Sequence, residues 1–472
     1  METQTLIDIF KEAGQGHVFR FWDELDESQK EHLLAQARQI DLPLLKKLID
    51  QEEEALKADA YDWSSITPAP YIAHPSQGGT SQPWEEAAHL GEEALRAGRV
   101  AAFTVAGGQG TRLGYEGPKG AFPVTPIRRK PIFQVFAEKL RTAQERYGVD
   151  FHWFIMTGLE NHEATIAFFK EHSFFGLEHV HFFRQGAFPA VNQSGKLILS
   201  AKHSIAMSPN GHGGALKALV ESGATQTMKT LGVDIISFFQ VDNPLINVID
   251  PAFIGFHLSQ NSEMSSKMVP KSSAEERVGV FCSEKDHLRI IEYSDFPESQ
   301  AQEKDADGVL AFRCGNVAIH TINRDFVERL GGHDASASMP YHYAKKKVLC
   351  IDSEGNPLAP EHPNGTKFEL FIFDALTFAK NPIVIETERA REFSPVKNAQ
   401  GADSVQTCHD DQLRLFARWA QAAGVDVPVD ESGLPPFSFE ISPLFADNET
   451  TFVERFNSLD PKPEIKEGTY LE

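Results

Sequence analysis

The chain has 472 residues, and its 45 Lys and Arg against 67 Asp and Glu give a formal net charge of −22. So acidic a chain lacks the basic surface on which nucleic-acid binding depends, and we therefore expect no nucleic-acid partner. Apolar residues make up 41%, enough to build a sizeable core, and the four cysteines are spaced neither as a zinc site nor as a disulfide framework.

Residues 1–95 are predicted to form an N-terminal helical segment followed by a strap. Met1–His17 lacks the basic and apolar regions of a signal peptide, and no apolar run approaches the roughly 18 residues of a membrane span, so we expect a cytoplasmic protein without a membrane partner. Apolar residues recur at helical spacing up to about residue 60. From Ser64 to Pro83 the sequence is rich in Pro, Ser, Gly and Thr, which predicts a linker or a strap over another domain.

Residues 96–384 are predicted to form the main domain, a doubly wound, Rossmann-like α/β sheet. Short apolar runs typical of buried strands alternate with amphipathic helices. The predicted strands are Val100–Ala106, Phe151–Thr157, Val180–Phe183 and Ile235–Val241, and the predicted helices between them are Pro131–Arg146 and Gly214–Leu219. After Asp250 the strands alternate polar and apolar residues, which predicts antiparallel additions and thus a mixed sheet. Residues 385–472 are expected to form a small C-terminal domain with a helix over Asp410–Ala423.

A glycine-rich loop, GGQGTRLG at residues 107–114, directly follows the first of these strands. Glycine allows positive φ, lets the backbone approach a ligand closely and leaves N–H groups free to bind an anion. The third glycine falls one residue late for a dinucleotide-binding fingerprint, and Lys119 follows a proline where a P-loop needs a glycine. The loop is therefore either a phosphate-binding loop of another kind or a structural turn.

Basic residues concentrate just after this loop. Arg112, Lys119 and Arg128–Lys130 lie within nineteen positions, against an acidic average for the whole chain. Ligands of open α/β sheets bind beyond the carboxyl ends of the strands, so Arg112 and Lys119 are candidates to bind a phosphate chain. A solvated basic loop is a plausible alternative interpretation for Arg128–Lys130, but a poor one for Arg112 and Lys119, which lie in glycine-rich turns.

Asp242 directly follows the predicted strand, in the motif FFQVDN. A carboxylate at the end of a buried strand suits Mg²⁺, which prefers oxygen ligands. An aspartate in this position is more often a helix cap or a turn residue, and only its combination with the glycine loop favours a metal site.

Taken together, these motifs resemble those of the eukaryotic-type UTP:sugar-1-phosphate uridylyltransferase family. The motifs that carry the resemblance follow in the family's order from about residue 14 to near residue 440: AGQGHVFRFWDEL, GGQGTRLG, GPKG, RQG, NGHGG, VDN, EYS, CGN, PNGTKFELFIFD, FSPVKN and EISPL. Within the family the chain is most similar to the enzymes that use N-acetylglucosamine 1-phosphate. The resemblance implies a central nucleotide-diphospho-sugar transferase domain, an N-terminal helical part and a small C-terminal domain.

The resemblance also implies roles for particular residues and a reaction. Gly107, Gly108 and Gly110 would hold UTP through their backbone, with Gln185 and Gly211 at the uracil. Arg112 and Lys119 would meet the phosphates, Lys397 would reach the sugar phosphate, and Asp242 would bind Mg²⁺. The sugar would be contacted by His212, Gly279, Glu292, Tyr293, Asn316, Phe371 and Phe373. A sugar-1-phosphate oxygen would attack the α-phosphorus of UTP in line and release pyrophosphate, which needs positioning and charge neutralisation but no general base.

The identity of the sugar rests on few residues. Tyr293, Phe371 and Phe373 match positions where the N-acetylglucosamine enzymes enclose the acetyl group, although aromatics at alternate strand positions are more often ordinary core. His212 stands where those enzymes usually carry Asn, and the glucose enzymes read Gly-His-Gly there. We therefore expect N-acetylglucosamine 1-phosphate as the substrate, with glucose 1-phosphate or a broad range of sugar phosphates as the alternative, and a nucleotide-sugar binder without activity as a third possibility.

Overall fold

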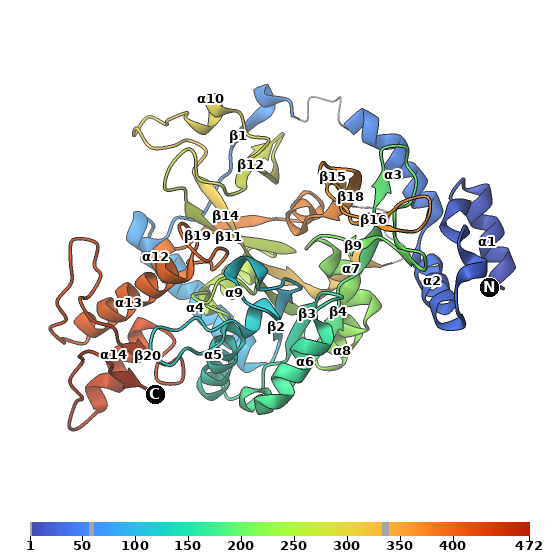
Figure 1. The fold of residues 1–472 in the computed structure, drawn as a ribbon. Helices are drawn as coiled ribbons and strands as arrows, with labels where there is room; N and C mark the ends of the chain where they lie inside the picture. Colours follow the sequence, from blue (N-terminus) through green and yellow to red (C-terminus); the bar gives the residue numbers. More distant parts are fainter. Residues whose placement is uncertain (1, 56–60, 333–338) are drawn as a thin grey trace. The chain divides into compact units, whose positions relative to one another are not determined.

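The structure is a computed structural model that describes residues 2–55, 61–332 and 339–472, and for 53–55 only the backbone (Figure 1). Its contacts group the chain into two compact units that interleave along the sequence. Unit 1 comprises Met1–Ser64, Gln185–Ala215 and Ser338–Asp374, and unit 2 comprises Ser65–Arg184, Leu216–Ala337 and Ala375–Glu472. The limits of these two units do not coincide with the predicted domain boundaries at residues 95 and 384, and those domain boundaries remain predictions.

Unit 2 is built on a ten-stranded sheet in which seven strands follow the order β1-β12-β14-β10-β2-β3-β4. The bounds of these strands are β1 Ile66–Pro68, β12 Val280–Glu284, β14 Cys314–Asn323, β10 Ile235–Gln240, β2 Val100–Ala106, β3 Trp153–Thr157 and β4 Val180–Arg184. Strands β10, β2, β3 and β4 are parallel, whereas β14 and β12 add antiparallel neighbours. The remaining three strands are β11 Met264–Pro270, β13 His287–Ile291 and β19 Ile383–Glu386. The predicted mixed, doubly wound sheet is confirmed.

The strand order explains where a ligand can bind in unit 2. From β2 the chain moves outward to β3 and then β4, and it returns to the other side of β2 to form β10. Adjacent parallel strands whose connections leave in opposite directions make a crevice at their carboxyl ends. The glycine loop follows β2 and Asp242 follows β10, so the switch in strand order brings these two candidate elements together.

Unit 2 also contains helices. They are α4 Ser81–Arg96, α5 Ile132–Tyr147, α6 His162–Glu171, α7 Gly214–Glu221 (which begins in unit 1), α8 Ala224–Thr230, α9 Pro251–Ser259, α10 Glu298–Ala301, α11 Arg324–Gly331, α12 Arg389–Glu392, α13 Val405–Ala422 and α14 Glu449–Ser458. Of these helices, α4, α5, α6 and α9 contribute side chains to the core of the sheet. Phe133, Phe136 and Leu140 on α5 are fully buried, as the helical spacing predicted. The helix expected over Asp410–Ala423 begins earlier, at Val405, where Ser404 caps it. A second cluster packs α13 and α14 around the short β20 Glu440–Ile441 and β21 Tyr470–Leu471.

The segment predicted as a linker or strap is more structured than its composition suggests. Ile66–Pro68 forms β1 and pairs with β12 at the edge of the sheet, and Ile72 bridges to Ile385. The helix α4 already begins at Ser81, inside the segment. Proline is tolerated in the first turn of a helix, because the N–H groups there have no partner within the helix.

Helices α4 and α9 cross at unusually close range (Figure 1). A Cβ atom added to Gly91 would lie 1.8 Å from the carbonyl oxygen of Pro251, and one added to Gly255 would lie 1.6 Å from that of Ala87. Only glycine fits at both positions, so the two backbones touch directly.

Unit 1 combines three N-terminal helices with small sheets. The helices are α1 Thr3–Glu12, α2 Glu27–Gln39 and α3 Leu42–Ala55, and the strands are β5 Ala187–Pro189, β6 Val191–Asn192, β7 Leu199–Ala201, β8 Ser204–Ile205, β9 Met207–Pro209, β15 Tyr341–Lys346, β16 Cys350–Ile351, β17 Pro357–Leu358 and β18 Gly365–Leu370. Leu33, Leu34 and Ala37 of α2 are buried in a core that reaches Phe368 of β18. Across the described residues of both units, none of the helices is long and apolar enough to cross a membrane.

Candidate active site

The glycine loop after β2 is a compact turn held by its own backbone. The N–H of Gly110 donates to Gly117 O at 3.0 Å, and the N–H of Lys119 donates to Gly108 O at 3.1 Å. Residues 111–113 form one 3-10 turn that ends at Gly114, whose φ of 68° favours glycine. A Cβ added to Gly110 would lie 2.8 Å from the ring of Tyr115, whereas one added to Gly108 would meet nothing within 4 Å. Packing therefore explains glycine at 110 but not at 108, where close approach of a ligand would explain it.

A buried asparagine holds this loop in place, and the sequence did not predict it as part of the site. Asn161 is fully buried before α6, and its Nδ2 donates to Ala106 O and Gly108 O, both at 3.0 Å. Its Oδ1 accepts the N–H of Gly158 at 2.8 Å. In the sequence Asn161 looks like an ordinary residue at the start of a helix, so only the fold reveals that it holds the loop.

Lys119 and Asp242 meet at the crevice between β2 and β10. Lys119 Nζ lies 3.8 Å from Asp242 Oδ2, and their side chains are 15% and 16% exposed. Burial lowers the pKa of Lys119, the charge of Asp242 raises it, and the nearby positive charges of Lys397 and Arg112 lower it further. The positive charges of Lys119, Lys397 and Arg112 thus repel one another, and an anion bound between them would offset this repulsion.

Arg112 is the exposed member of the group. An exposed arginine on a glycine loop is free to turn toward a phosphate, with which it can form two parallel hydrogen bonds.

The segment leading to Lys397 is attached to the end of β10 by hydrogen bonds. Val396 N–H donates to Asp242 O at 2.8 Å. The next residue along the chain from Asp242, Asn243, donates from Nδ2 to Glu392 O at 2.7 Å and accepts the N–H of Ser394 at 3.0 Å. The structure therefore brings Lys397, predicted from a motif far downstream in the sequence, next to Asp242 and Lys119.

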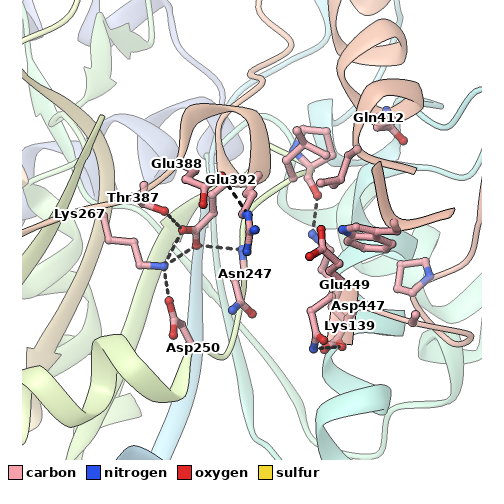
Figure 2. A pocket seen from close by; sticks show the side chains of 18 of the residues that line it. Lys139, Asn247, Asp250, Lys267, Thr387, Glu388, Glu392, Gln412, Asp447 and Glu449 are labelled. Atoms are coloured by element: carbon pink, nitrogen blue, oxygen red, sulfur yellow. Dashed lines mark hydrogen bonds and ion pairs between the residues drawn. The ribbon is translucent and has the colours of Figure 1, made fainter. Parts of the chain in front are cut away.

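A cavity of about 280 Å³ lies next to this attachment, and Glu392 lines it (Figure 2). Lys267 lies in its wall between Asp250 and Glu392, with its Nζ 2.5 Å from a carboxylate oxygen of each. Lys139 donates to Pro244 O at 2.8 Å and Ile246 O at 2.6 Å, and burial lowers its pKa to about 8. Arg112, Lys119, Asp242 and Lys397 do not belong to the described residues that line this cavity. The residues of its wall belong to the segments on which the candidate residues lie. The cavity itself is not the predicted phosphate site.

Within the basic stretch Arg128–Lys130, Arg128 and Arg129 are exposed whereas Lys130 is buried. Lys130 is 5% exposed, and its Nζ donates to Glu138 Oε1 at 2.7 Å and Ser442 Oγ at 3.1 Å. The guanidinium of Arg128 lies 4.3 Å from the ring centre of Tyr470. Neither the phosphate-binding nor the solvated interpretation of Lys130 is right, because its charge is neutralised inside the protein.

Three predicted sugar contacts gather on neighbouring antiparallel strands of unit 2. Val280 pairs with Ile291 and with Gly315, which places Gly279, Glu292 and Asn316 side by side. The N–H of Asn316 donates to Gly279 O at 2.8 Å, and Glu292 Oε1 lies 3.5 Å from where a Cβ of Gly279 would be. Tyr293 is 46% exposed and lines a surface pocket with Lys271.

The remaining predicted contacts gather in unit 1. Gln185 Nε2 donates to Gly211 O at 2.7 Å. Gly211 has a φ of 80°, and a Cβ there would lie 2.3 Å from Leu370 O, so both conformation and space require glycine. The NGHGG motif therefore packs on the end of β18.

His212 takes part in a stack of rings in unit 1. Its ring lies 5.3 Å from that of Phe371, and the Phe371 ring also stacks with that of His342 at 4.2 Å. His342 Nε2 lies 2.8 Å from Asp374 Oδ2. Strand β18 ends at Leu370, so Phe371 and Phe373 are not at alternate strand positions as expected: Phe371 follows the strand and Phe373 lies in a 3-10 turn. His342 is a member of this cluster that sequence reasoning missed.

His212 is held in its neutral form. Its Nδ1 accepts the main-chain N–H of Ile372 at 3.2 Å, so the proton of the neutral ring is on Nε2. Burial, and secondarily the neighbouring His342, lower the pKa of His212 to about 4. The ring therefore offers an N–H donor throughout the neutral pH range.

Comparison with known proteins gives concordant results. The family model described as UTP–glucose-1-phosphate uridylyltransferase matches residues 45–412. The UDP-N-acetylglucosamine pyrophosphorylase of Saccharomyces cerevisiae is 36% identical over 436 residues, which cover 89% of this chain and 91% of that protein. The UDP-N-acetylhexosamine pyrophosphorylase-like protein 1 of Xenopus tropicalis is 35% identical over 464 residues, with 92% and 90% covered.

Solved structures agree with the fold. The uridine diphosphate N-acetylglucosamine pyrophosphorylase of Trypanosoma brucei, solved in complex with an inhibitor, superposes with a TM-score of 0.82 at 26% identity and covers 99% of this chain and 98% of its own. A UDP-glucose pyrophosphorylase mutant of Leishmania major, in complex with its UDP-sugar, gives a TM-score of 0.61 at 15% identity, with 91% and 87% covered. The second likeness shows a shared fold only.

Proposed function

The chain belongs to the UTP–glucose-1-phosphate uridylyltransferase family, and from this membership we propose that it forms UDP-N-acetylglucosamine and pyrophosphate from UTP and N-acetylglucosamine 1-phosphate. The enzyme class, a nucleotidyltransferase that joins UTP to a sugar 1-phosphate, follows from the family and its relatives. The observation in the structure that best supports it is the group formed by the glycine loop, Lys119 and Asp242 at the switch in strand order.

The residues of this group suit an in-line displacement at phosphorus. The attacking sugar phosphate is already an anion, so the protein has to position two polyanions and offset their repulsion. The N–H groups of the glycine loop and the cations of Arg112 and Lys119 are proposed to bind the UTP phosphates. Lys397, held near them by the Val396–Asp242 hydrogen bond, is proposed to meet the phosphate of the sugar.

Asp242 is the proposed ligand of a magnesium ion. Within the described residues, no group of three or more His, Cys, Asp or Glu side chains is arranged to hold a metal. Mg²⁺ commonly binds through one or two carboxylates, with substrate phosphates and water completing its shell. A single, partly exposed carboxylate beside a phosphate site fits that mode. When bound, the ion would neutralise phosphate charge, and Asp242→Asn should then raise the Mg²⁺ concentration needed for half-maximal activity.

The choice of N-acetylglucosamine rests on the relatives and on the aromatic cluster. The yeast and trypanosome proteins carry that sugar in their names. Phe371 is partly exposed, and it is held by ring contacts with His212, His342 and the buried Phe373, so its fixed ring is an apolar group that an acetyl group could contact. Glucose 1-phosphate remains the second candidate substrate because of His212, whose Nε2–H could donate a hydrogen bond to a sugar hydroxyl.

A pyrophosphate-release assay tests activity and sugar together. The purified protein is given UTP and Mg²⁺ with N-acetylglucosamine 1-phosphate, N-acetylgalactosamine 1-phosphate or glucose 1-phosphate at equal concentrations. We expect kcat/KM with the first to exceed that with glucose 1-phosphate by about tenfold or more, the range that one pocket contact can provide. Faster turnover of glucose 1-phosphate would overturn the sugar assignment, and absence of turnover with all three would overturn the proposed function.

A further inference from the structure

The loop from Lys397 to Asp403 is closed by its own backbone. The N–H groups of Lys397 and Asn398 both donate to Asp403 O, at 2.7 and 3.0 Å. Asn398 Nδ2 adds a bond to Ala402 O at 2.8 Å. Directly after the loop, Ser404 caps α13 by accepting the N–H of Thr407. Asp403 is thus fixed between a closed loop and a capped helix.

The conformation of Asp403 is one that few side chains adopt. Its φ is 52°, in the left-handed region, where a side chain other than Gly, Asn or Asp is seldom found. Two residues earlier the chain uses Gly401, with a φ of 80°. A glycine at 403 would meet the backbone requirement without strain, so the carboxylate calls for a reason beyond the turn.

The carboxylate of Asp403 contacts Lys397. Lys397 Nζ lies 3.2 Å from Asp403 Oδ2, and the two side chains are 39% and 40% exposed. An ion pair this exposed adds little to folding stability. Both charges also act on Lys119: the Lys397 charge lowers its pKa and that of Asp403 raises it. The pair therefore lies within electrostatic reach of the proposed phosphate site.

We propose that Asp403 is a positioning residue that holds the ammonium group of Lys397 toward the phosphate site. The inference rests on the proposed function, in which Lys397 meets the sugar phosphate. A lysine side chain has many rotamers, and restricting them before the substrate binds reduces the entropy lost on binding. Asp403 contacts Lys397 twice: its carbonyl oxygen fixes the backbone of Lys397, and its carboxylate restrains the side chain.

A double-mutant cycle tests the inference. The wild type, Asp403→Asn, Lys397→Ala and the double variant are assayed for kcat and for KM of both substrates, with each substrate varied against saturating amounts of the other. Asparagine tolerates the left-handed conformation and keeps the loop's backbone bonds, so only the charge is lost. We expect Asp403→Asn to lower kcat/KM for the sugar phosphate by about three- to tenfold, to leave KM for UTP unchanged, and to cause no further loss in the Lys397→Ala background.

Two controls separate this role from a structural one. Asp410 lies on α13 and accepts a hydrogen bond from Gln406 at 2.8 Å, and Asp410→Asn should leave all constants unchanged. Asp403→Gly relieves the backbone strain but lacks the carboxylate, and should behave like Asp403→Asn. Equal losses from Asp403→Asn in both backgrounds, or no loss in either, would overturn the inference. If instead the wild type has no activity, or Lys397→Ala keeps full activity, the proposed function or the role of Lys397 fails, independently of Asp403.

Discussion

Individual charged residues in this protein differ in function according to what they face. Lys119, Lys130 and Lys267 are all largely buried, but Lys130 and Lys267 are in close contact with carboxylates. Lys119 has its nearest carboxylate at 3.8 Å and stands beside other cations. A lysine paired this closely with carboxylates has a structural role, whereas a lysine surrounded by unbalanced positive charge is available to bind an anionic ligand.

Replacement of Lys119 by alanine should impair the reaction far more than the fold. Removing one charged donor aimed at the transition state costs on the order of 10²–10³ in kcat, and we expect a loss of that size in the pyrophosphate-release assay. Lys170→Ala, at an exposed position on α6, is the matched control and should retain full activity. If Lys119→Ala kept more than about a third of wild-type kcat, the role given to this lysine would be wrong.

His212 should make folding stability depend on acidity in a defined range. Its folded-state pKa of about 4 lies below the ordinary value of 6.5, so between these values the unfolded chain binds a proton that the folded one does not. Stability from this group is complete above pH 6.5 and is lost as the pH falls through 4. Urea titrations of wild type and His212→Asn should therefore converge as the pH is lowered, by at most about 3 kcal/mol.

A control for that titration is Ser259→Ala, since Ser259 lies at an exposed position and its replacement removes no titratable group, so its difference from wild type should be constant with pH. A constant difference for His212→Asn as well would contradict the neutral, buried imidazole.

At the scale of elements, strand ends determine where the candidate residues lie. The residues after β2 and β10 meet because these two strands are parallel neighbours. Directly before Asp242, the N–H of Val241 donates to Val105 O at 3.1 Å, which ties the end of β10 to the end of β2. The separation of Asp242 from the glycine loop is thus set by backbone hydrogen bonds between neighbouring strands.

The segment between β10 and α9 is held at both ends. Its start is joined to β2 through Val241. Its end is Asp250, which caps α9 by accepting the N–H groups of Ala252 and Phe253. Helix α9 is in turn fixed to α4 through Gly91 and Gly255. The helix crossing therefore restrains the chain that follows Asp242.

The crossing of α4 and α9 should not tolerate a single added methyl group. In Gly255→Ala the new Cβ would lie 1.6 Å from Ala87 O, so the helices would have to separate. We expect the free energy of unfolding to fall by about 3 kcal/mol or more, measured by urea denaturation. Ser259→Ala, at an exposed position at the end of the same helix, should change stability by less than about 0.5 kcal/mol. A stable Gly255→Ala variant would contradict the direct backbone contact.

At the scale of the whole molecule, a strongly acidic protein is proposed to bind polyanionic substrates at a small positive group. The net charge of −22 would repel UTP at a distance, whereas Arg112, Lys119 and Lys397 are the cations proposed to attract it nearby. Added salt screens long-range repulsion between exposed charges more than it weakens short, partly buried contacts.

We therefore expect KM for UTP to stay level or to fall by up to about twofold when NaCl is raised from about 20 to 150 mM at fixed free Mg²⁺. Initial rates with UTP varied at each salt concentration measure this. A protein that attracts its polyanionic ligand through its overall charge would show the opposite trend. A steep rise in KM with salt would therefore contradict the idea that the net charge of this protein repels UTP.

Local patterns in the sequence were sufficient to predict the central sheet. The apolar runs gave β2 with its observed bounds and located β3, β4 and β10 to within two residues, because buried parallel strands are continuously apolar. The glycine loop and Asp242 were recognisable because each directly follows one of these strands.

Features that depend on distant contacts could not be predicted in this way. The roles of Asn161 and His342 carry no local signal, since the Gly108 oxygen and the Asp374 carboxylate that they contact lie far from them in the sequence. The same holds for Lys130, whose partner Ser442 is 312 positions away. The interleaved units likewise arise from long-range packing, which a periodic pattern of apolar residues does not encode.

The hydrogen bond from Val396 N–H to Asp242 O has an evolutionary consequence. It joins two main-chain groups, so no side-chain substitution short of proline at 396 can remove it. Mutations can therefore accumulate around it without separating Asp242 from the segment that carries Lys397. The aromatic cluster of Phe371 and His212, in contrast, consists of side chains, each of which one codon change can alter. Under the proposed roles, relatives that diverge from this sequence would thus exchange one sugar for another while inheriting the same phosphate chemistry.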